Sequence, residues 1–584
     1  MTTATDLEDA PRAAAPRLTL VALLQRRGGA RRGPRQHAPR AGARAVLFRA
    51  TVAGAAGLAI GAAFPGRSWW PLASIGVALL LAAVHGCRPT WAASTALLAG
   101  SVFFLPHLWW AVVASGSVLG WIVLALAQAS SWAVFAVSWV VVARLRPVLT
   151  HPGAQPWVAA VLWVAVEQLR AQWPLGGFPW ALLAYSQSES PLLRLAPWGG
   201  SALVSAMVVV LGGYLYLCGW SLRHRALPAA TGSLVAVLAL SAAAALTPHP
   251  TLVDAGTMLV GVVQGNVPGP ELSGERRARQ VLENHVQGTR ALAEESSAAE
   301  LDLVLWPESS TDIDPRRDAA AARRVQAAAL AVQAPIAVGT QRYVPDGRYN
   351  EYVLWSAQEG ASPQVYAKQR PVPFGEYIPA RAWIRRLTAA VDQVTVDMLP
   401  GESRATFEVP VPRLARAVPL AVGICFEVAF DEPLRGAVRD GGELIVIPTN
   451  NASFGYTQEA SQQLAMGRFQ AAQHGRALVQ VSTVGRSAVI SPEGGLLWSS
   501  GLFTSDRTVM QVPLRTGLTL ADRLGALPGR TAVGAAVALL VVGVLTGGPK
   551  RRQGRPLRGC TSSTGARVEG AGALHGAPAE GLAR

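Results

Sequence analysis

Charged residues are scarce in this sequence: Asp, Glu, Lys and Arg make up 15% of its 584 residues, against about a quarter in an ordinary soluble protein. Cysteine is scarcer still, with four residues, which excludes a small domain stapled by disulfides. Because hydrophobic residues make up 51%, a disordered polyelectrolyte is excluded as well. A long chain with this balance is typical of a membrane protein.

Acidic residues are fewer than basic ones, and the difference is concentrated at the two ends. The formal net charge is +16, and segments 1–44 and 549–584 carry eleven of these charges. Basic segments bind nucleic acids in some proteins, but beside long apolar runs they more often mark the cytoplasmic side of a membrane protein. We therefore expect two disordered cytoplasmic tails and no nucleic-acid partner.

Long apolar stretches fill residues 45–247, and one more lies near the C-terminus. A membrane-spanning helix needs about 20 predominantly apolar residues. The sequence predicts a polytopic helical bundle of eight spans: 45–64, 70–87, 90–114, 117–143, 155–173, 198–221, 227–247 and 531–547.

Arginine residues between the predicted spans indicate the orientation. With a cytoplasmic N-terminus, the inner loops carry Arg88, Arg144, Arg146, Arg223 and Arg225. The outer loops carry only Arg67 and Arg194, and the second is offset by Glu189. The positive-inside rule then predicts that both termini are cytoplasmic and that the segment 257–515 is extracytoplasmic.

Two ionisable residues, Glu167 and Arg170, fall in the fifth predicted span. Charged side chains at membrane depth are costly and are usually functional. The alternative is that the two residues lie at the water interface and pair with each other. The sequence leaves both interpretations open.

Residues 257–515 have the pattern of a separate α/β domain. Helices are expected over 314–332, with Asp314 as N-cap and Pro315 at the first helical position, and over 458–474. Many strands with interspersed helices predict a layered α/β fold with its own core. The expected strands are 258–263, 301–306, 335–339, 352–355, 364–367, 420–425, 444–447, 478–482 and 487–490.

Cys425 is the one cysteine that the predicted topology places outside the cytoplasm. An unpaired thiol in an oxidising compartment is a liability unless it is buried or chemically employed. Cys425 ends an apolar strand and is followed two residues later by Glu427. Because a strand-to-turn junction presents a side chain to a cleft, this setting suits a nucleophile, and a buried structural cysteine is the alternative that the setting alone leaves open.

Lysine is almost absent: of the 52 Lys and Arg residues only Lys368 and Lys550 are lysines. Lys550 lies in the basic tail, where either residue would serve. Lys368 precedes a loop punctuated by proline and glycine, so we infer a need for a compact ammonium that a guanidinium cannot replace.

Glu308 is the third candidate catalytic residue, beside Cys425 and Lys368. The motif Leu305-Trp306-Pro307-Glu308 places Glu308 directly after an apolar strand that the proline ends. Glu308 as base, Lys368 as ammonium and Cys425 as thiol are far apart in the chain, so they can form a site only in the folded protein. Together they predict nucleophilic catalysis in which Glu308 takes the thiol proton and Lys368 stabilises an oxyanion.

The contexts of these residues, WPES, KQRPVPFGEY and GICFE, resemble the nitrilase (carbon–nitrogen hydrolase) superfamily. The motifs PLGGFPW, QGN at 264–266 and NNASFG at 450–455, together with the spans, are similar to the bacterial apolipoprotein N-acyltransferase family. The resemblance covers residues 45–548.

This resemblance implies an extracytoplasmic αββα sandwich beside the membrane bundle, and no cofactor or metal. It implies acyl transfer from a membrane phospholipid, through a thioester, to the terminal amine of a diacylglyceryl-modified apolipoprotein. The resemblance also gives supporting roles to Glu376, which would orient Lys368, and to Glu427, beside the nucleophile. Asn450 and Asn451 are implied substrate or lid residues.

The sequence departs from the family pattern at two places. The better-known members carry a tryptophan shortly after QGN, where this chain reads Pro268-Gly269-Pro270, and Phe426 stands where tyrosine is frequent. We expect these differences to alter lipid handling or rate rather than the reaction.

A lid is expected between residues 377 and 400. Trp383, Ile384, Leu387 and Val391 follow helical spacing, with arginines interleaved. This pattern predicts a surface helix resting on anionic headgroups, with Trp383 and Leu387 toward the lipid. Ordinary packing of the helix onto the domain is the alternative.

Three other classes of protein share part of the pattern. A membrane-tethered nitrilase-type amidase would have the same three catalytic residues but needs only one anchor. A transporter with an exported domain would need more buried charge than Glu167 and Arg170 provide. A noncatalytic scaffold has no reason to assemble Glu308, Lys368 and Cys425.

Overall fold

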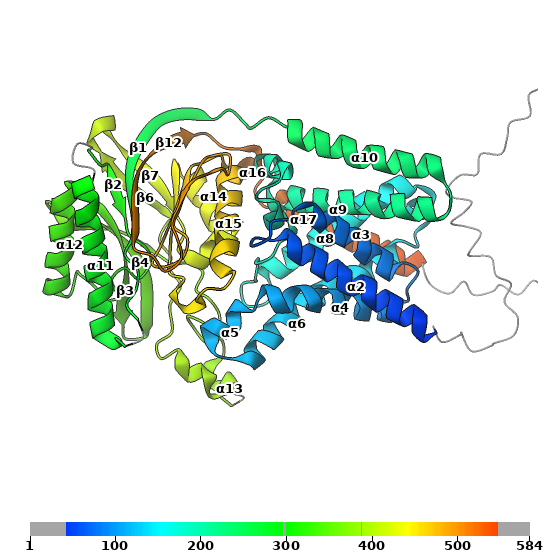
Figure 1. Ribbon diagram of the computed structural model, residues 1–584, viewed down its shortest axis with the longest axis horizontal. Helices are drawn as coiled ribbons and strands as arrows, with labels where there is room; N and C mark the ends of the chain where they lie inside the picture. Colours follow the sequence, from blue (N-terminus) through cyan, green and yellow to red (C-terminus); the bar gives the residue numbers. More distant parts are fainter. Residues whose placement is uncertain (1–41, 270, 296–299, 387, 547–584) are drawn as a thin grey trace, which may run out of the picture. The chain divides into compact units, whose positions relative to one another are not determined.

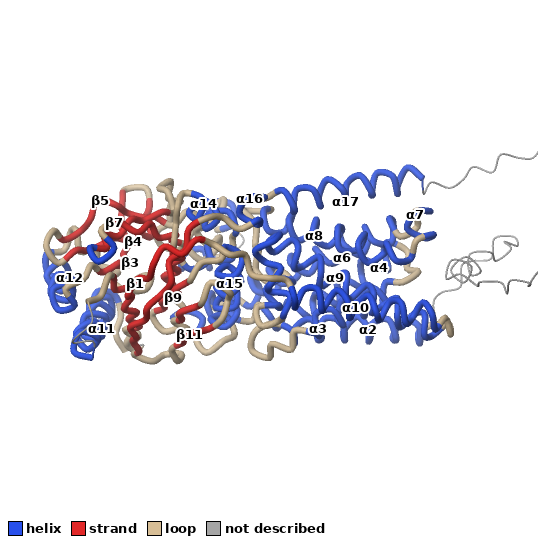
Figure 2. The backbone as a smooth tube through the Cα atoms, turned by 90° about the horizontal axis from the view of Figure 1, so that it is seen from above, coloured by secondary structure: helices blue, strands red, loops and turns tan. Residues whose placement is uncertain are grey.

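A computed structural model describes residues 42–269, 271–295, 300–386 and 388–546. Residues 1–41 of the predicted N-terminal tail, the predicted C-terminal tail 549–584 and Leu387 of the predicted lid lie outside the described residues. The described chain contains a set of apolar helices and an α/β sandwich (Figure 1; Figure 2).

Helices lie at every position where the sequence predicts a span. Five of them are long and apolar enough to cross a membrane: α2, α6, α9 with the turn before it, α10 and α17; α3 is apolar but shorter. The predicted bundle of apolar helices is therefore confirmed at the level of five or six helices. The bounds are α2 (Ala43–Ala63), α3 (Pro71–Val84), α4 (Pro89–His107), α6 (Val118–Val142), α8 (Gln155–Gln172), α9 (Ala196–Arg223), α10 (Leu227–Leu246) and α17 (Leu527–Thr546).

The predicted extent of the third span, 90–114, is wrong. α4 ends at His107, and a separate short helix, α5 (Trp110–Ser115), follows it. Pro106 lies in the last turn of α4, where it removes a backbone donor, and Leu108 leaves the helical conformation with φ −103° and ψ 17°. The break redirects the chain before α5 begins.

Glycines let several helices of the bundle approach closely. A Cβ on Gly57 of α2 would lie 2.3 Å from the Ala99 carbonyl oxygen of α4. A Cβ on Gly212 of α9 would lie 2.7 Å from the Ser74 carbonyl oxygen and from Val77 Cβ, both on α3. Small residues at such crossings are a common means of packing helices in membranes.

The sandwich contains two six-stranded sheets. The strand order is β12-β1-β2-β3-β4-β5 in one sheet and β11-β10-β9-β8-β7-β6 in the other. In each sheet three neighbouring strands, β1-β2-β3 and β7-β8-β9, are parallel, and the other pairs are antiparallel. The first sheet comprises β1 (Val253–Gln264), β2 (Leu303–Leu305), β3 (Ile336–Val344), β4 (Gly347–Ser356), β5 (Gly360–Ala367) and β12 (Asp506–Thr516). The second comprises β6 (Thr406–Val411), β7 (Arg416–Val422), β8 (Leu444–Thr449), β9 (Leu478–Ser482), β10 (Ala488–Ile490) and β11 (Leu496–Ser499).

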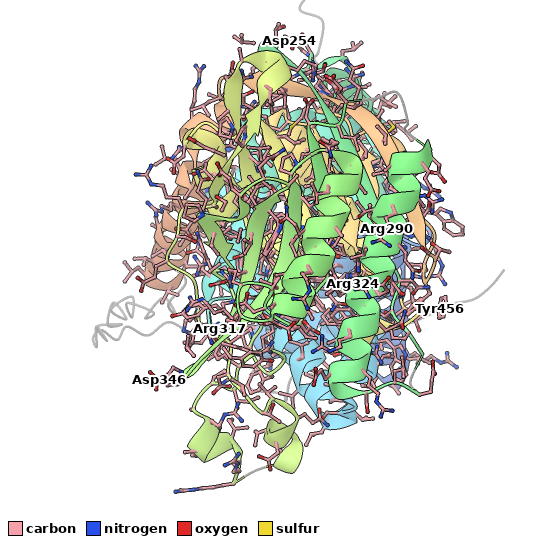
Figure 3. All side chains as sticks on the ribbon, turned by 90° about the vertical axis from the view of Figure 1, so that its left-hand side faces the viewer. Asp254, Arg290, Arg317, Arg324, Asp346 and Tyr456 are labelled. Carbon is pink, nitrogen blue, oxygen red and sulfur yellow. The ribbon has the colours of Figure 1, made fainter. Side chains whose placement is uncertain are left out.

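Helices cover the outer faces of the two sheets, which gives four layers. α11 (Gly274–Glu295) and α12 (Ala319–Val332) cover the first sheet, side by side in Figure 3, which labels Arg290 on α11 and Arg324 on α12. α14 (Asp431–Arg439) and α15 (Glu459–His474) cover the second sheet. The predicted layered α/β fold is confirmed, and it brings the carboxyl ends of the parallel strands β2 and β7 into one region.

The predicted helix 314–332, with its N-cap at Asp314, begins four residues late. α12 starts at Ala319, and its N-cap is Asp318, whose side chain accepts a hydrogen bond from the Ala321 amide at 2.8 Å. Asp314 instead accepts from the amide and guanidinium of Arg316. The predicted helix 458–474 is confirmed as α15, whereas α11, α14, β6, β11 and β12 were not predicted.

The predicted lid helix between residues 377 and 400 is also wrong. The segment contains one helical turn, α13 (Arg381–Ile384), and a 3₁₀ turn, Ala389–Gln393. An ion pair between Arg381 and Asp397 folds the segment back on itself. Of the apolar side chains that suggested a helix, Val391 and Ile384 pack in a small local cluster with Ile378 and Val394, whereas Trp383 is exposed.

The close crossing of α9 and α3 gives a stability prediction. Gly212→Ala should lower the midpoint of thermal unfolding of the purified membrane protein, because overpacking at a tight contact costs about 1–3 kcal/mol. Gly232→Ala on α10 is the matched control, since a Cβ there meets nothing within 4 Å. Equal midpoints for the two variants would contradict the close packing.

Candidate active site

The turn after β7 presents the predicted nucleophile. Cys425 begins the 3₁₀ turn Cys425–Ala429 with a φ of 55°, in the left-handed region that side chains other than glycine rarely adopt. Strain of this kind is found at functional sites whose surroundings fix the backbone. The Cys425 side chain is half-buried between the buried residues Ile424 and Phe426.

Glu427 holds this turn against the segment that carries the lysine. Its fully buried carboxylate accepts hydrogen bonds from the Ile424 amide and the Tyr366 hydroxyl, both at 2.7 Å. Its second oxygen accepts from the amides of Gln369 at 2.7 Å and Arg370 at 3.0 Å. One side chain thus fixes the nucleophile turn and the residues after Lys368 relative to each other.

Glu308 follows β2 and the rigid Trp306-Pro307 pair. One carboxylate oxygen accepts a hydrogen bond from the Asn350 side-chain amide at 2.5 Å and lies 3.4 Å from Lys368 Nζ. The other oxygen accepts from the Asn450 backbone amide at 2.8 Å. Glu308 is therefore held by the first sheet through Asn350 and by the second through Asn450.

Lys368 lies directly after β5 and is fully buried, at 0% exposure. Its ammonium donates to Glu376 Oε1 at 2.6 Å, and the second Glu376 oxygen accepts from the Val372 amide at 2.7 Å. Burial alone would lower the pKa of Lys368, but the carboxylates of Glu308 and Glu376 raise it above its ordinary value. The side chain therefore remains a charged ammonium throughout the neutral range.

The thiol of Cys425 is neutral at rest. Burial and the carboxylate of Glu308 raise its pKa, and the Lys368 ammonium opposes them only in part. A neutral thiol is a weak nucleophile, so the reaction needs a base at the site. Glu308 is the carboxylate whose charge acts both on this thiol and on Lys368.

An aromatic wall lies beside the nucleophile and includes residues from the helical half. The Phe426 ring lies 6.1 Å from Trp180 at an interplanar angle of 20° and 5.9 Å from Phe178. The Trp180 indole donates to Gln462 on α15 at 2.7 Å. The segment before α9 and the sandwich therefore meet next to Cys425.

Glu167 and Arg170 shape the segment that carries this wall. Both are buried on α8. Arg170 donates to the carbonyl oxygens of Phe178 at 3.0 Å and Trp180 at 2.7 Å, while Glu167 accepts from the Leu183 amide at 2.9 Å. Both side chains lie inside the protein and organise the backbone around Trp180.

The remaining predicted site residues lie in different surroundings. Asn450 lines a cavity of about 90 Å³ with Ser309, Asp312 and Arg277, and its amide contacts Glu308. Asn451 is buried behind the nucleophile and faces α15. Trp383 lies on α13 with 59% of its surface exposed.

Two residues of the site were missed in the sequence. Asn350, on the buried strand β4, donates to Glu308, and Gln463, on α15, donates to Cys425 Sγ at 3.6 Å. Asn350 gave no clear signal, because Arg348 and Glu351 make the strand around it polar. A glutamine on a helix carries no signal either, because it is ordinary on a solvated face.

The assembled groups are suited to covalent acyl transfer. They comprise a neutral thiol on a strained turn, a carboxylate fixed beside it and a permanent ammonium. Among the described residues, no group of three His, Cys, Asp or Glu side chains is arranged to hold a metal ion.

Comparison with known families gives two matches that together cover most of the chain. Residues 56–214 match the apolipoprotein N-acyltransferase N-terminal domain, and residues 259–517 match the carbon-nitrogen hydrolase family. The first match covers most of the helical half, and the second covers the sandwich with Glu308, Lys368 and Cys425.

Individual proteins are also similar to this chain, namely one solved structure and two curated relatives. Among solved structures, Saccharomyces cerevisiae Nit3, a member of branch 10 of the nitrilase superfamily, is 14% identical, with 47% of this chain and 96% of that chain covered and a TM-score of 0.33. The apolipoprotein N-acyltransferase of Azotobacter vinelandii is 32% identical over 73% of this chain and 81% of that protein. That of Mycolicibacterium smegmatis is 35% identical over 84% of each. The chain therefore belongs to the apolipoprotein N-acyltransferase family.

Proposed function

We propose that this chain N-acylates lipoproteins through a thioester on Cys425, with a membrane phospholipid as acyl donor and the terminal amine of diacylglyceryl-cysteine as acceptor. The observation that carries the proposal is the buried Lys368 ammonium, held by Glu308 and Glu376, whose charge acts on the Cys425 thiol. Membership of the family indicates the reaction, and Glu308, Lys368 and Cys425 are the groups that we propose perform it.

In the first half-reaction Glu308 takes the proton from Cys425 Sγ, and the thiolate attacks the carbonyl carbon of the phospholipid ester. Lys368 stabilises the oxyanion of the tetrahedral intermediate. When the intermediate collapses, the ester oxygen leaves on the lysophospholipid and takes the proton from Glu308. The products are a thioester on Cys425 and a lysophospholipid with a free hydroxyl.

In the second half-reaction the acceptor amine attacks the thioester carbonyl while Glu308 takes one of its protons. The sulfur leaves as the new amide bond forms, and it recovers that proton from Glu308. The apolar wall of Phe426, Trp180 and Phe178 suits the acyl chain and limits the access of water, which would hydrolyse the thioester.

We propose further that all eight helices at the predicted span positions, including the shorter α3, cross the cytoplasmic membrane. α4 packs against α2 and α6, and α8 packs against α6, α9 and α17, so both have neighbours on several sides and need less apolar surface than the others. The arginines at 88, 144, 146, 223 and 225 follow α3, α6 and α9, whereas α5 and the segment before α9 lie next to the sandwich. The positive-inside rule then makes both termini cytoplasmic and the catalytic sandwich extracytoplasmic.

A transfer assay tests the function directly. Wild-type protein in phospholipid vesicles should convert a diacylglyceryl-cysteine peptide to a product that is heavier by one acyl chain, measured by mass spectrometry. Cys425→Ala should form no product, because no thioester can form. Cys218→Ala, which removes a free cysteine from α9, is the matched control and should retain activity. Product from Cys425→Ala would refute the thioester, and release of free fatty acid in place of product would indicate a hydrolase.

The ammonium of Lys368 cannot be replaced by a guanidinium. Lys368→Arg should lower kcat by about 10²–10³, the usual cost of losing an oxyanion donor, because the larger group does not fit the fully buried position between two carboxylates. Arg290→Lys on the exposed face of α11 is the converse control and should leave kcat unchanged. A Lys368→Arg variant within threefold of wild type would contradict this role of the lysine.

A further inference from the structure

A buried network behind the nucleophile is not used in the two half-reactions. Gln463, fully buried on α15, donates from Nε2 to Cys425 Sγ at 3.6 Å. Its Oε1 accepts from the Thr449 hydroxyl at 3.1 Å and from Asn451 Nδ2 at 2.9 Å. Because the Asn451 amide can only donate through this nitrogen, the Gln463 oxygen must face Asn451 and its N–H groups must face the sulfur.

The orientation of the Asn451 amide is fixed by hydrogen bonds to both its nitrogen and its oxygen. Nδ2 also donates to Glu459 Oε2 at 2.7 Å, and Oδ1 accepts from the Ser482 hydroxyl at 2.6 Å. The Ser482 oxygen accepts from the Gly485 amide at 2.8 Å, so its proton is free to point at Asn451. A flipped Asn451 would place its oxygen against the Glu459 carboxylate and against Gln463.

Glu459 is the charged end of this chain of hydrogen bonds. It is the first residue of α15, with 2% of its surface exposed, and its hydrogen-bond partner in the network is Asn451. The charged group that acts on Glu459 is Glu308, whereas Glu308, Lys368 and Glu459 all act on the sulfur of Cys425. Burial, together with the Glu308 carboxylate, raises the pKa of Glu459 to about 8.

We propose that Glu459 is a positioning residue for the nucleophile: through Asn451 and Gln463 it keeps an N–H directed at Cys425 Sγ, and its own ionisation controls how readily the thiolate forms. The inference rests on the thioester mechanism proposed above. It assigns a role to a carboxyl group that touches neither the substrate nor the sulfur.

Ionisation of Glu459 should make the thiolate of Cys425 harder to form. Below about pH 8 the side chain is neutral, and one oxygen still accepts from Asn451 while the other holds the proton. Above that pH a second carboxylate beside Glu308 raises the pKa of the Cys425 thiol and opposes its ionisation. Formation of the acyl-enzyme should therefore slow as the pH rises through about 8.

The test measures the rate of acyl-enzyme formation from phospholipid vesicles between about pH 6 and 10, by intact mass. Glu459→Gln keeps an acceptor for Asn451 without a charge, so it should match wild type at neutral pH and lose the decline at high pH. Glu459→Ala should be slower by about tenfold, with KM for phospholipid unchanged, because the amide chain loses its anchor. Ser461→Ala on the same helix is the matched control and should reproduce the wild-type profile.

A second readout does not depend on lipid. The rate of alkylation of Cys425 by iodoacetamide should rise severalfold in Glu459→Gln relative to wild type above about pH 8, because the thiolate then forms without the opposing charge. If wild type forms no acyl-enzyme, the proposed function fails, and alkylation alone decides the role of Glu459.

Two results would overturn the inference. One is a wild-type rate and pH profile, in both readouts, for folded Glu459→Ala. The other is a Glu459→Gln variant that folds with a wild-type melting temperature but is as slow as Glu459→Ala at neutral pH, because the amide retains the hydrogen bond on which the proposal depends.

Discussion

The buried ammonium of Lys368 is the interaction on which the rest of the site depends. A charge removed from water costs several kcal/mol unless it is paired and hydrogen-bonded. Lys368 meets this requirement with two carboxylates, Glu308 and Glu376, that come from different segments of the chain. Glu427 then ties the residues after Lys368 to the turn of Cys425. The need to neutralise one charge therefore brings together Glu308, Lys368 and Cys425, the proposed base, oxyanion donor and nucleophile.

The helical half contributes to the site as well as to anchoring. Arg170 and Glu167 would be expensive at membrane depth, yet they bind the backbone of the segment 178–183 and fix Trp180 against Phe426. The break after His107 frees α5, from which Trp110 donates to Gln462 at 3.1 Å, the residue that also accepts from Trp180. The wall beside Cys425 is thus built from a segment of the helical half and from the sandwich together, an arrangement that suits the proposed lipid substrates.

Much of this arrangement could be predicted from the sequence, and the exceptions have physical causes. The apolar helices followed from hydropathy, and Lys368 followed from its rarity, because both signals are carried by the residues themselves. Gln463 and Glu459 could not be found, since a glutamine or glutamate on a helix is ordinary unless burial makes it costly. The predicted lid helix failed because Ile384 and Val391 have helical spacing but pack in a local cluster with Ile378 and Val394. In a short segment, the surrounding fold determines which contacts the apolar residues make, so their spacing alone does not predict a helix.

The proposed mechanism requires an acyl group that stays covalently on Cys425 between two half-reactions. The most direct measurement loads the purified protein with a labelled acyl chain, removes the phospholipid and adds the diacylglyceryl peptide. The label should then leave the protein and appear as an amide on the peptide in equal amount. Label that remains on the protein, while peptide is acylated only when phospholipid is added back, would contradict the proposed mechanism.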